Sequence, residues 1–122
     1  MVGFFQRRRI LKNTSALDLI PIRIHEHTMA DNGNVTILVP KFKNERFSRF
    51  FIPANRSKFI SIFLDELGTA VWLAMDGTKN VGTICKELSE SLGEKIYPAE
   101  ERVVKFLSGL YHNKHITFRQ IE

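Results

Sequence analysis

The sequence predicts an α+β domain in which a three-stranded antiparallel sheet is followed by a three-helix bundle. Three observations support this prediction. Up to Leu64 the apolar residues alternate with polar ones or form short β-branched runs, which is typical of strands. From Asp65 onward they recur every three or four residues, which is typical of helices. A chain of 122 residues with 43% hydrophobic content suffices for one core and is too short for two.

The first two strands are expected to form an antiparallel hairpin. Residues 17–28 are predicted as a strand because Ile22 and Ile24 alternate with polar neighbours, and residues 35–39 are rich in β-branched side chains. Between them, the sequence Asp-Asn-Gly-Asn at 31–34 tolerates the left-handed backbone of a chain reversal.

A third strand is predicted at Lys58–Leu64, where Ile60 and Ile62 lie on one face and Phe59 and Phe63 on the other. A strand that is apolar on both faces is expected to be covered on both. The connection before it holds four phenylalanines, at Phe42, Phe47, Phe50 and Phe51. Two interpretations of these side chains stay open: they pack over the sheet, or some form an exposed docking patch.

Three helices are predicted after this strand. Asp65 is expected to cap the first helix, Trp72 to anchor it in the core, and Asp76-Gly77 to end it. The second helix extends from about Val81 to Leu92, and the third begins near Pro98. Their apolar stripes are Val81, Ile84, Cys85, Leu88 and Leu92 in the second helix and Val103, Phe106, Leu107, Leu110 and Tyr111 in the third. Residues 115–118 are predicted to add a strand or wing.

The positive charge is concentrated at the N-terminus. The formal net charge is +5, and Arg7, Arg8, Arg9 and Lys12 stand among the first twelve residues without any acid. The other 14 of the 18 Lys and Arg residues are balanced by 13 Asp and Glu residues. We therefore expect a basic flexible arm at 1–16 and a single domain at 17–122. The arm is either a solvated tail or a contact for an acidic peptide, RNA or an anionic lipid surface.

Several classes of protein are excluded by composition. The sequence has no apolar run that could span a membrane and no secretory signal, so a cytoplasmic protein is expected. The single cysteine, Cys85, excludes an intramolecular disulfide and occupies a core position. A metal site would require the pair His25 and His27 to meet the pair His112 and His115. No catalytic constellation stands out, and we predict no metal, no cofactor and no enzymatic activity.

Residues 64–72 (LDELGTAVW), 75–77 (MDG) and 81–84 (VGTI) together resemble the signature of the PqqD family. In that signature a Leu-Asp/Asn-Glu start and a small residue open a helix, a Trp follows, and Asp-Gly precedes a Val/Ile-rich second helix. The resemblance covers about residues 58–118. The longer Phe-rich connection and the basic arm depart from the shortest members and leave the pathway open, and nothing in the sequence specifies pyrroloquinoline quinone.

The resemblance implies a winged-helix-like domain that binds the leader of a ribosomally made precursor peptide. The leader adds as a strand beside the third strand, in a groove whose other wall is the third helix. A radical SAM enzyme or another modifying enzyme then acts on the core of the peptide. Strand addition takes affinity from backbone hydrogen bonds and specificity from side-chain pockets.

The predicted peptide-binding residues lie on these two elements: Lys58, Phe59, Ser61 and Phe63 on the strand, and Arg102, Lys105 and Ser108 on the helix. Two alternatives accompany the prediction. Phe59 and Phe63 are otherwise core residues, and the cations on the helix are otherwise a solvated face.

Two other functions are compatible with the predicted fold. A winged helix is common in DNA-binding proteins, but Glu100 and Glu101 in the first turn of the third helix carry the wrong charge for DNA, so nucleic acid is not an expected partner. A general protein-interaction module is the other alternative. An exposed sheet edge can also pair with a second copy of the chain, which leaves a homodimer open.

Overall fold

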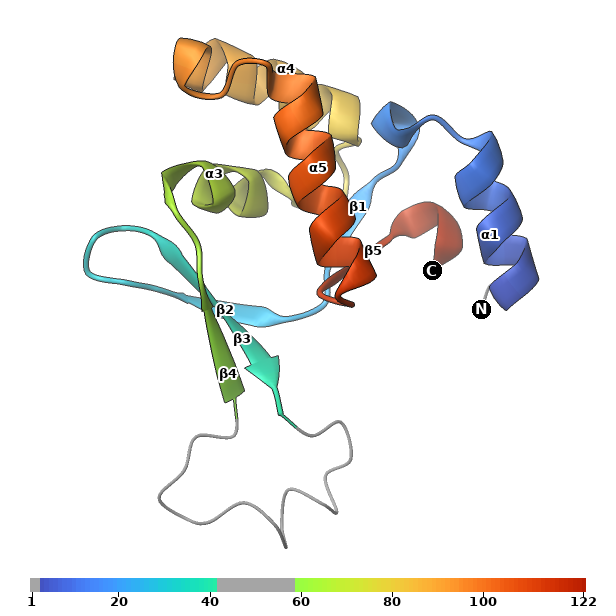
Figure 1. Cartoon of the computed structure of the whole chain (residues 1–122), viewed down its shortest axis with the longest axis horizontal. Coiled ribbons are helices and arrows are strands. Elements are labelled where there is room, and N and C mark those ends of the chain that lie inside the picture. Colours follow the sequence, from blue (N-terminus) through green and yellow to red (C-terminus); the bar gives the residue numbers. More distant parts are fainter. Residues whose placement is uncertain (1–2, 42–58) are drawn as a thin grey trace, which may run out of the picture.

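A computed structural model describes residues 3–41 and 59–122. These residues form an α+β fold with four α-helices and two small antiparallel sheets, which confirms the predicted class (Figure 1). The helices are α1 (Phe4–Asn13), α3 (Glu66–Ala74), α4 (Val81–Leu92) and α5 (Ala99–His112). The strands are β1 (Pro21–Arg23), β2 (Glu26–Met29), β3 (Val35–Pro40), β4 (Phe59–Phe63) and β5 (Ile116–Phe118). Short 3₁₀ turns occupy Ala16–Asp18, Gly93–Lys95 and Arg119–Ile121.

The larger sheet has the strand order β2-β3-β4, with both pairs antiparallel. The hairpin between β2 and β3 and the predicted third strand are therefore confirmed. The smaller sheet pairs β1 with β5, so that residues 116–118 are a strand, as predicted for this part of the chain.

The prediction of one continuous strand over residues 17–28 is wrong. Residues 16–18 form a 3₁₀ turn, and β1 and β2 belong to different sheets. The chain bends between them at His25, next to Ile24, whose side chain is 51% exposed. β1 pairs with β5, which follows α5 at the far end of the chain, and no local pattern in the sequence reveals so distant a partner.

The helices begin and end much as expected. The Asp65 carboxylate accepts a hydrogen bond from the Gly68 N–H at 2.7 Å, which confirms it as an N-cap. The Asn80 side chain caps α4 by accepting from the Thr83 N–H at 2.8 Å. Gly93 follows α4 with φ +55°, a backbone region that favours glycine.

One core joins the helices to the larger sheet. The predicted stripes are confirmed, because their central residues are buried: Ile84, Cys85, Leu88, Val103, Leu107 and Leu110. Phe106 is half-buried against them. The winged-helix arrangement and the three-helix bundle stay predictions.

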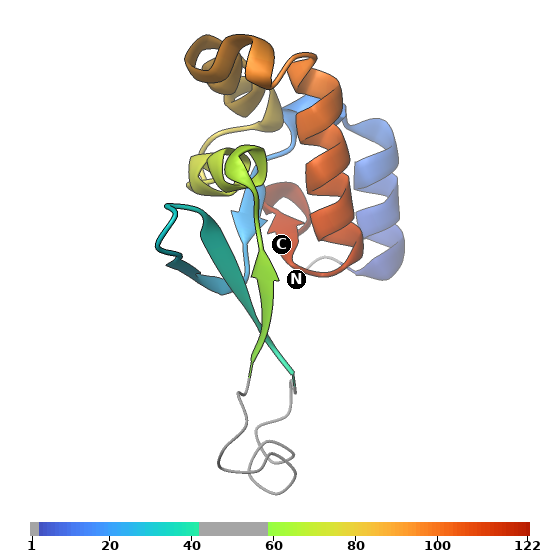
Figure 2. The same cartoon turned by 60° about the vertical axis from the view of Figure 1, so that its left-hand side comes forward.

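The basic N-terminal segment is helical in the structure. Residues 4–13 form α1, which packs against the 3₁₀ turn at Arg119–Ile121 on the same side of the molecule as α5 (Figures 1 and 2). Ile10 and Leu11 are half-buried against the core, whereas Arg9 and Lys12 are exposed. The sequence did not suggest this helix because three adjacent arginines obscure a short apolar face. The flexible arm at 1–16 and the domain boundary after it stay expectations. Within the described ranges, no helix combines the length and the apolar character needed to cross a membrane.

Candidate functional site

The outer edge of β4 is the first component of the candidate site. The Leu64 N–H donates to the Val35 carbonyl of β3 at 3.0 Å. In an antiparallel pair the backbone groups of successive residues point alternately toward and away from the partner strand. Ile62 therefore also faces β3, whereas the N–H and C=O groups of Ser61 and Phe63 point away from it. In the described part of the chain, β4 is an edge of its sheet.

The two faces of β4 differ in their surroundings. Ile62 and Leu64 are half-buried against the core. Phe59 and Phe63 lie on the opposite face and are 38% and 79% exposed. The expectation that both faces are covered is therefore wrong among the described residues, and so is the alternative that these two phenylalanines are core residues. They are accessible, but they do not face α5.

A groove separates β4 from α5 and forms the second component of the site. Its strand side consists of Ile62 and Leu64. Its other lining residues are Arg102, Lys105, Phe106, Gly109, Leu110, Asn113 and His115. A Cβ added at Gly109 would meet no heavy atom within 4 Å, so the groove approaches the helix backbone closely at this position.

The two predicted cations of α5 both line the groove. The Arg102 guanidinium donates to the Lys95 carbonyl at 2.8 Å, which fixes its position at the start of the helix. Lys105 is exposed, and neither ion pair of the described residues includes it. The groove thus combines an apolar floor with positive charge along one wall.

The other predicted site residues are not part of this groove. Ser108 lies on the side of α5 that faces α1 and lines a separate cavity. Lys58 and the four phenylalanines at 42, 47, 50 and 51 lie outside the described residues. The prediction missed Ile62, Phe106, Gly109 and His115. Helical spacing could have identified Phe106 and Gly109, because residues 102, 106, 109 and 113 share one stripe of α5.

Residues of the signature hold β4 and α5 in place. A Cβ at Gly68 would come within 3.4 Å of the Phe106 ring and 3.2 Å of the Asp65 carboxylate, so any side chain here would force these neighbours to shift by a few tenths of an ångström. Trp72 is fully buried, and its indole N–H donates to Nδ1 of His27 on β2 at 3.1 Å. The predicted role of Trp72 as a core anchor is confirmed.

A histidine pair lies at one end of the groove. Nε2 of His25 and Nδ1 of His115 are 3.1 Å apart, within hydrogen-bonding distance. The Ile24 N–H also donates to the His115 carbonyl. Burial lowers the pKa of His115 from its usual 6.5. The pair links the bend between β1 and β2 to the start of β5.

Cys85 is buried in α4, and burial raises the pKa of its thiol, which therefore stays protonated. A thiol in this environment is a poor nucleophile. Within residues 3–41 and 59–122 no three His, Cys, Asp or Glu side chains gather into a metal-binding group.

Fold and groove together define a small α+β domain with an open sheet edge beside a helix. Residues 57–116 match the family model described as coenzyme PQQ synthesis protein D (PqqD). This part of the chain is similar to the PqqD family, which is non-catalytic and is associated with peptide binding in the biosynthesis of PQQ and other ribosomally made peptide products. Neither a curated protein nor a solved structure matches the chain.

Proposed function

We propose that this protein is a non-catalytic peptide-binding chaperone. It binds the leader of a ribosomally synthesised precursor peptide and presents that peptide to a modifying enzyme, of the radical SAM type or another, in the cytoplasm. The family match supports peptide binding in general. The particular leader and the modifying enzyme are part of the proposal.

One observation carries the proposal: among the described residues, β4 is an edge strand that borders a groove. The backbone groups of Ser61 and Phe63 point away from β3, and they are the groups that an added strand pairs with. In this proposal an extended leader lies along β4 and uses α5 as its second wall. Each backbone hydrogen bond contributes about 1 kcal/mol net.

The lining of the groove suggests which leaders fit. Alternate side chains of an added strand point to the same face, so one set of leader residues meets Ile62, Leu64 and Phe106. These positions favour apolar side chains. Arg102 and Lys105 favour acidic residues at neighbouring positions, with a contribution of about 0 to 1 kcal/mol for each exposed pair.

Proline substitution in β4 tests strand addition. Binders are first selected from a displayed library of random linear peptides. Ser61→Pro removes an outward N–H and leaves the bonds to β3 intact, so it should abolish peptide binding while the protein stays folded. Ile62→Pro removes an N–H that faces β3 and serves as the matched control, because it should unfold the sheet.

Peptide affinity by titration calorimetry and folding by circular dichroism are the two measurements. Lys105→Glu should weaken binding modestly and mostly at low salt. If Lys105→Glu abolished binding while folded Ser61→Pro bound normally, addition at this edge would be wrong.

The α5 wall of the groove can be tested without loss of stability. Gly109→Ala should stabilise the fold by about 0.5 to 1 kcal/mol, because alanine is the better helix former and the added Cβ meets open space. Gly109→Leu projects a branched side chain into the groove and should block the same peptides. Normal peptide binding by folded Gly109→Leu would place the ligand elsewhere.

A further inference from the structure

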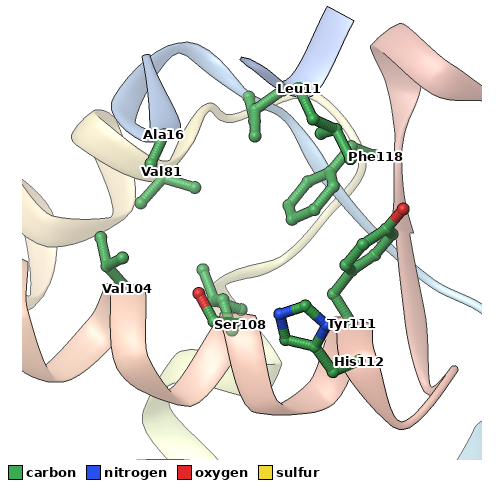
Figure 3. Close-up of a pocket in the computed structure, with 10 residues that line it drawn as sticks. Leu11, Ala16, Val81, Val104, Ser108, Tyr111, His112 and Phe118 are labelled. Atoms are coloured by element: carbon green, nitrogen blue, oxygen red, sulfur yellow. The ribbon is translucent and has the colours of Figure 1, made fainter. Parts of the chain in front are cut away.

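A second cavity lies on the side of α5 that faces α1, away from the peptide groove (Figure 3). Its volume is about 250 Å³. The lining residues come from α1, the 3₁₀ turn at 16–18 and its C-cap, α4, α5 and β5: Leu11, Ala16, Leu19, Val81, Val104, Leu107, Ser108, Tyr111, His112 and Phe118. The proposed peptide-binding site does not include this cavity.

The lining is apolar with a polar group at one side. Figure 3 shows Ser108 and His112 projecting from α5, with Leu11 and Phe118 across the cavity from them. None of the ten lining residues is acidic. Such a surface accommodates an apolar group and offers hydrogen bonds to one polar substituent.

The volume restricts the ligand to a small molecule. An apolar cavity of about 150 Å³ is large enough for benzene, whereas drug-sized ligands occupy pockets of roughly 300 Å³ or more. A volume between these limits holds one or two fused rings. It is too small for a peptide strand or a helix.

The charge of α1 favours an anion, although Arg7 itself is not among the residues that line the cavity. Arg7 lies one helical turn before Leu11 on the same stripe of α1. The Nε of Arg7 is buried and has no hydrogen-bond partner among the described residues. Because this Nε is closed to water it does not border the cavity, so a ligand would meet the outer nitrogens of the guanidinium, a group well suited to binding a carboxylate. α1 contains no acidic residue that could pair with it.

We propose that the cavity between α1, α4 and α5 binds a small aromatic carboxylate. The ring lies among Val104, Leu107 and Phe118, and the carboxylate is directed to the basic side of α1 near Arg7. This site is independent of peptide binding at β4.

The experiment uses the full-length protein with two probes, indole-3-acetate and neutral indole, and follows the backbone amide shifts by two-dimensional NMR. Indole-3-acetate should cause saturable shifts at residues of α5 and α1 that line the cavity. Ser108→Phe fills the cavity from an exposed position and should abolish them, and Ala16→Leu provides a second filled variant if the first does not fold. Absence of saturable shifts, or unchanged binding in a filled variant, would overturn the proposal.

A matched pair of arginine variants tests the charge. Arg7→Gln should weaken indole-3-acetate about tenfold, because a hydrogen bond to a charged group is worth roughly 1.5 kcal/mol or more, and should leave indole unchanged. Arg9→Gln, on the exposed side of α1, should leave both probes unchanged. Equal effects of the two substitutions would reject a specific carboxylate site at Arg7.

Discussion

The indole of Trp72 is fully buried and connects α3 to β2 through its hydrogen bond to His27. The position of Trp72 in the middle of a predicted helix was enough to predict an anchor in the core, and its side chain is fully buried. Its hydrogen bond to His27 was not predictable, because it depends on how α3 lies across β2. Sequence periodicity identifies the buried face of an element, whereas a specific partner requires the tertiary arrangement.

The same limit applies to the site residues. Ser61 was predicted to bind through its backbone, and its N–H points to the open edge. Phe59 and Phe63 were predicted from the same strand, yet they lie on the face away from α5. Because side chains alternate along a strand, one pattern gives two faces, and only the structure shows which face borders the groove.

The contact between His25 and His115 predicts a pH dependence of stability. A hydrogen bond between two imidazole nitrogens requires one neutral ring as acceptor. The folded protein favours neutral His115, because burial lowers its pKa below the usual 6.5. The contribution of neutral His115 to the free energy of unfolding is complete above pH 6.5 and is lost as the pH falls below that value.

Urea unfolding between about pH 7.5 and pH 5 measures this loss, since that interval spans the titration of histidine. The wild-type midpoint should fall with the pH. His115→Gln should flatten the dependence, whereas His112→Gln, at an exposed position on α5, should retain it. An identical slope in the wild type and His115→Gln would contradict the assignment.

At the scale of elements, α5 contributes residues to two separate surfaces. One stripe, which includes Arg102, Phe106 and Gly109, borders the peptide groove. Another, which includes Val104 and Ser108, borders the cavity beside α1. The sequence predicted the core stripe between them correctly, but assigned Ser108 to the same surface as Arg102. Neighbours of the helix, and not its own periodicity, decide what each exposed stripe faces.

The helix α1 provides a prediction at this scale. Deletion of residues 1–13 should lower the melting temperature by about 5 to 10 °C, because half-burial of Ile10 and Leu11 contributes roughly 1 kcal/mol each. Differential scanning calorimetry measures the change. Arg9→Ala should leave the melting temperature nearly unaltered, and a deletion without effect would support the flexible arm expected from the sequence.

At the scale of the whole molecule, the α+β class, the order of the main elements and the shared core were predictable from sequence. The division of the strands between two sheets was not, because β1 pairs with β5, which is separated from it by most of the chain. The groove is likewise a product of the complete fold. β4 contributes one wall and α5 the other, and α3 sets their separation through the close packing at Gly68.

The open edge of β4 also has a consequence for how the protein behaves at high concentration. An edge strand does not distinguish a peptide from the same edge of a second molecule, so two copies can pair through β4 about a two-fold axis. The exposed side chains of Ile60 and Phe63 favour such pairing. Each pair would occupy both edges, and the protein would act as a competitive inhibitor of its own peptide binding.

Sedimentation velocity should reveal a dimer that the selected peptides dissociate and that Ser61→Pro cannot form. The apparent Kd for peptide should rise with protein concentration. A Kd that stays constant while dimers accumulate would show that the molecules associate through another surface.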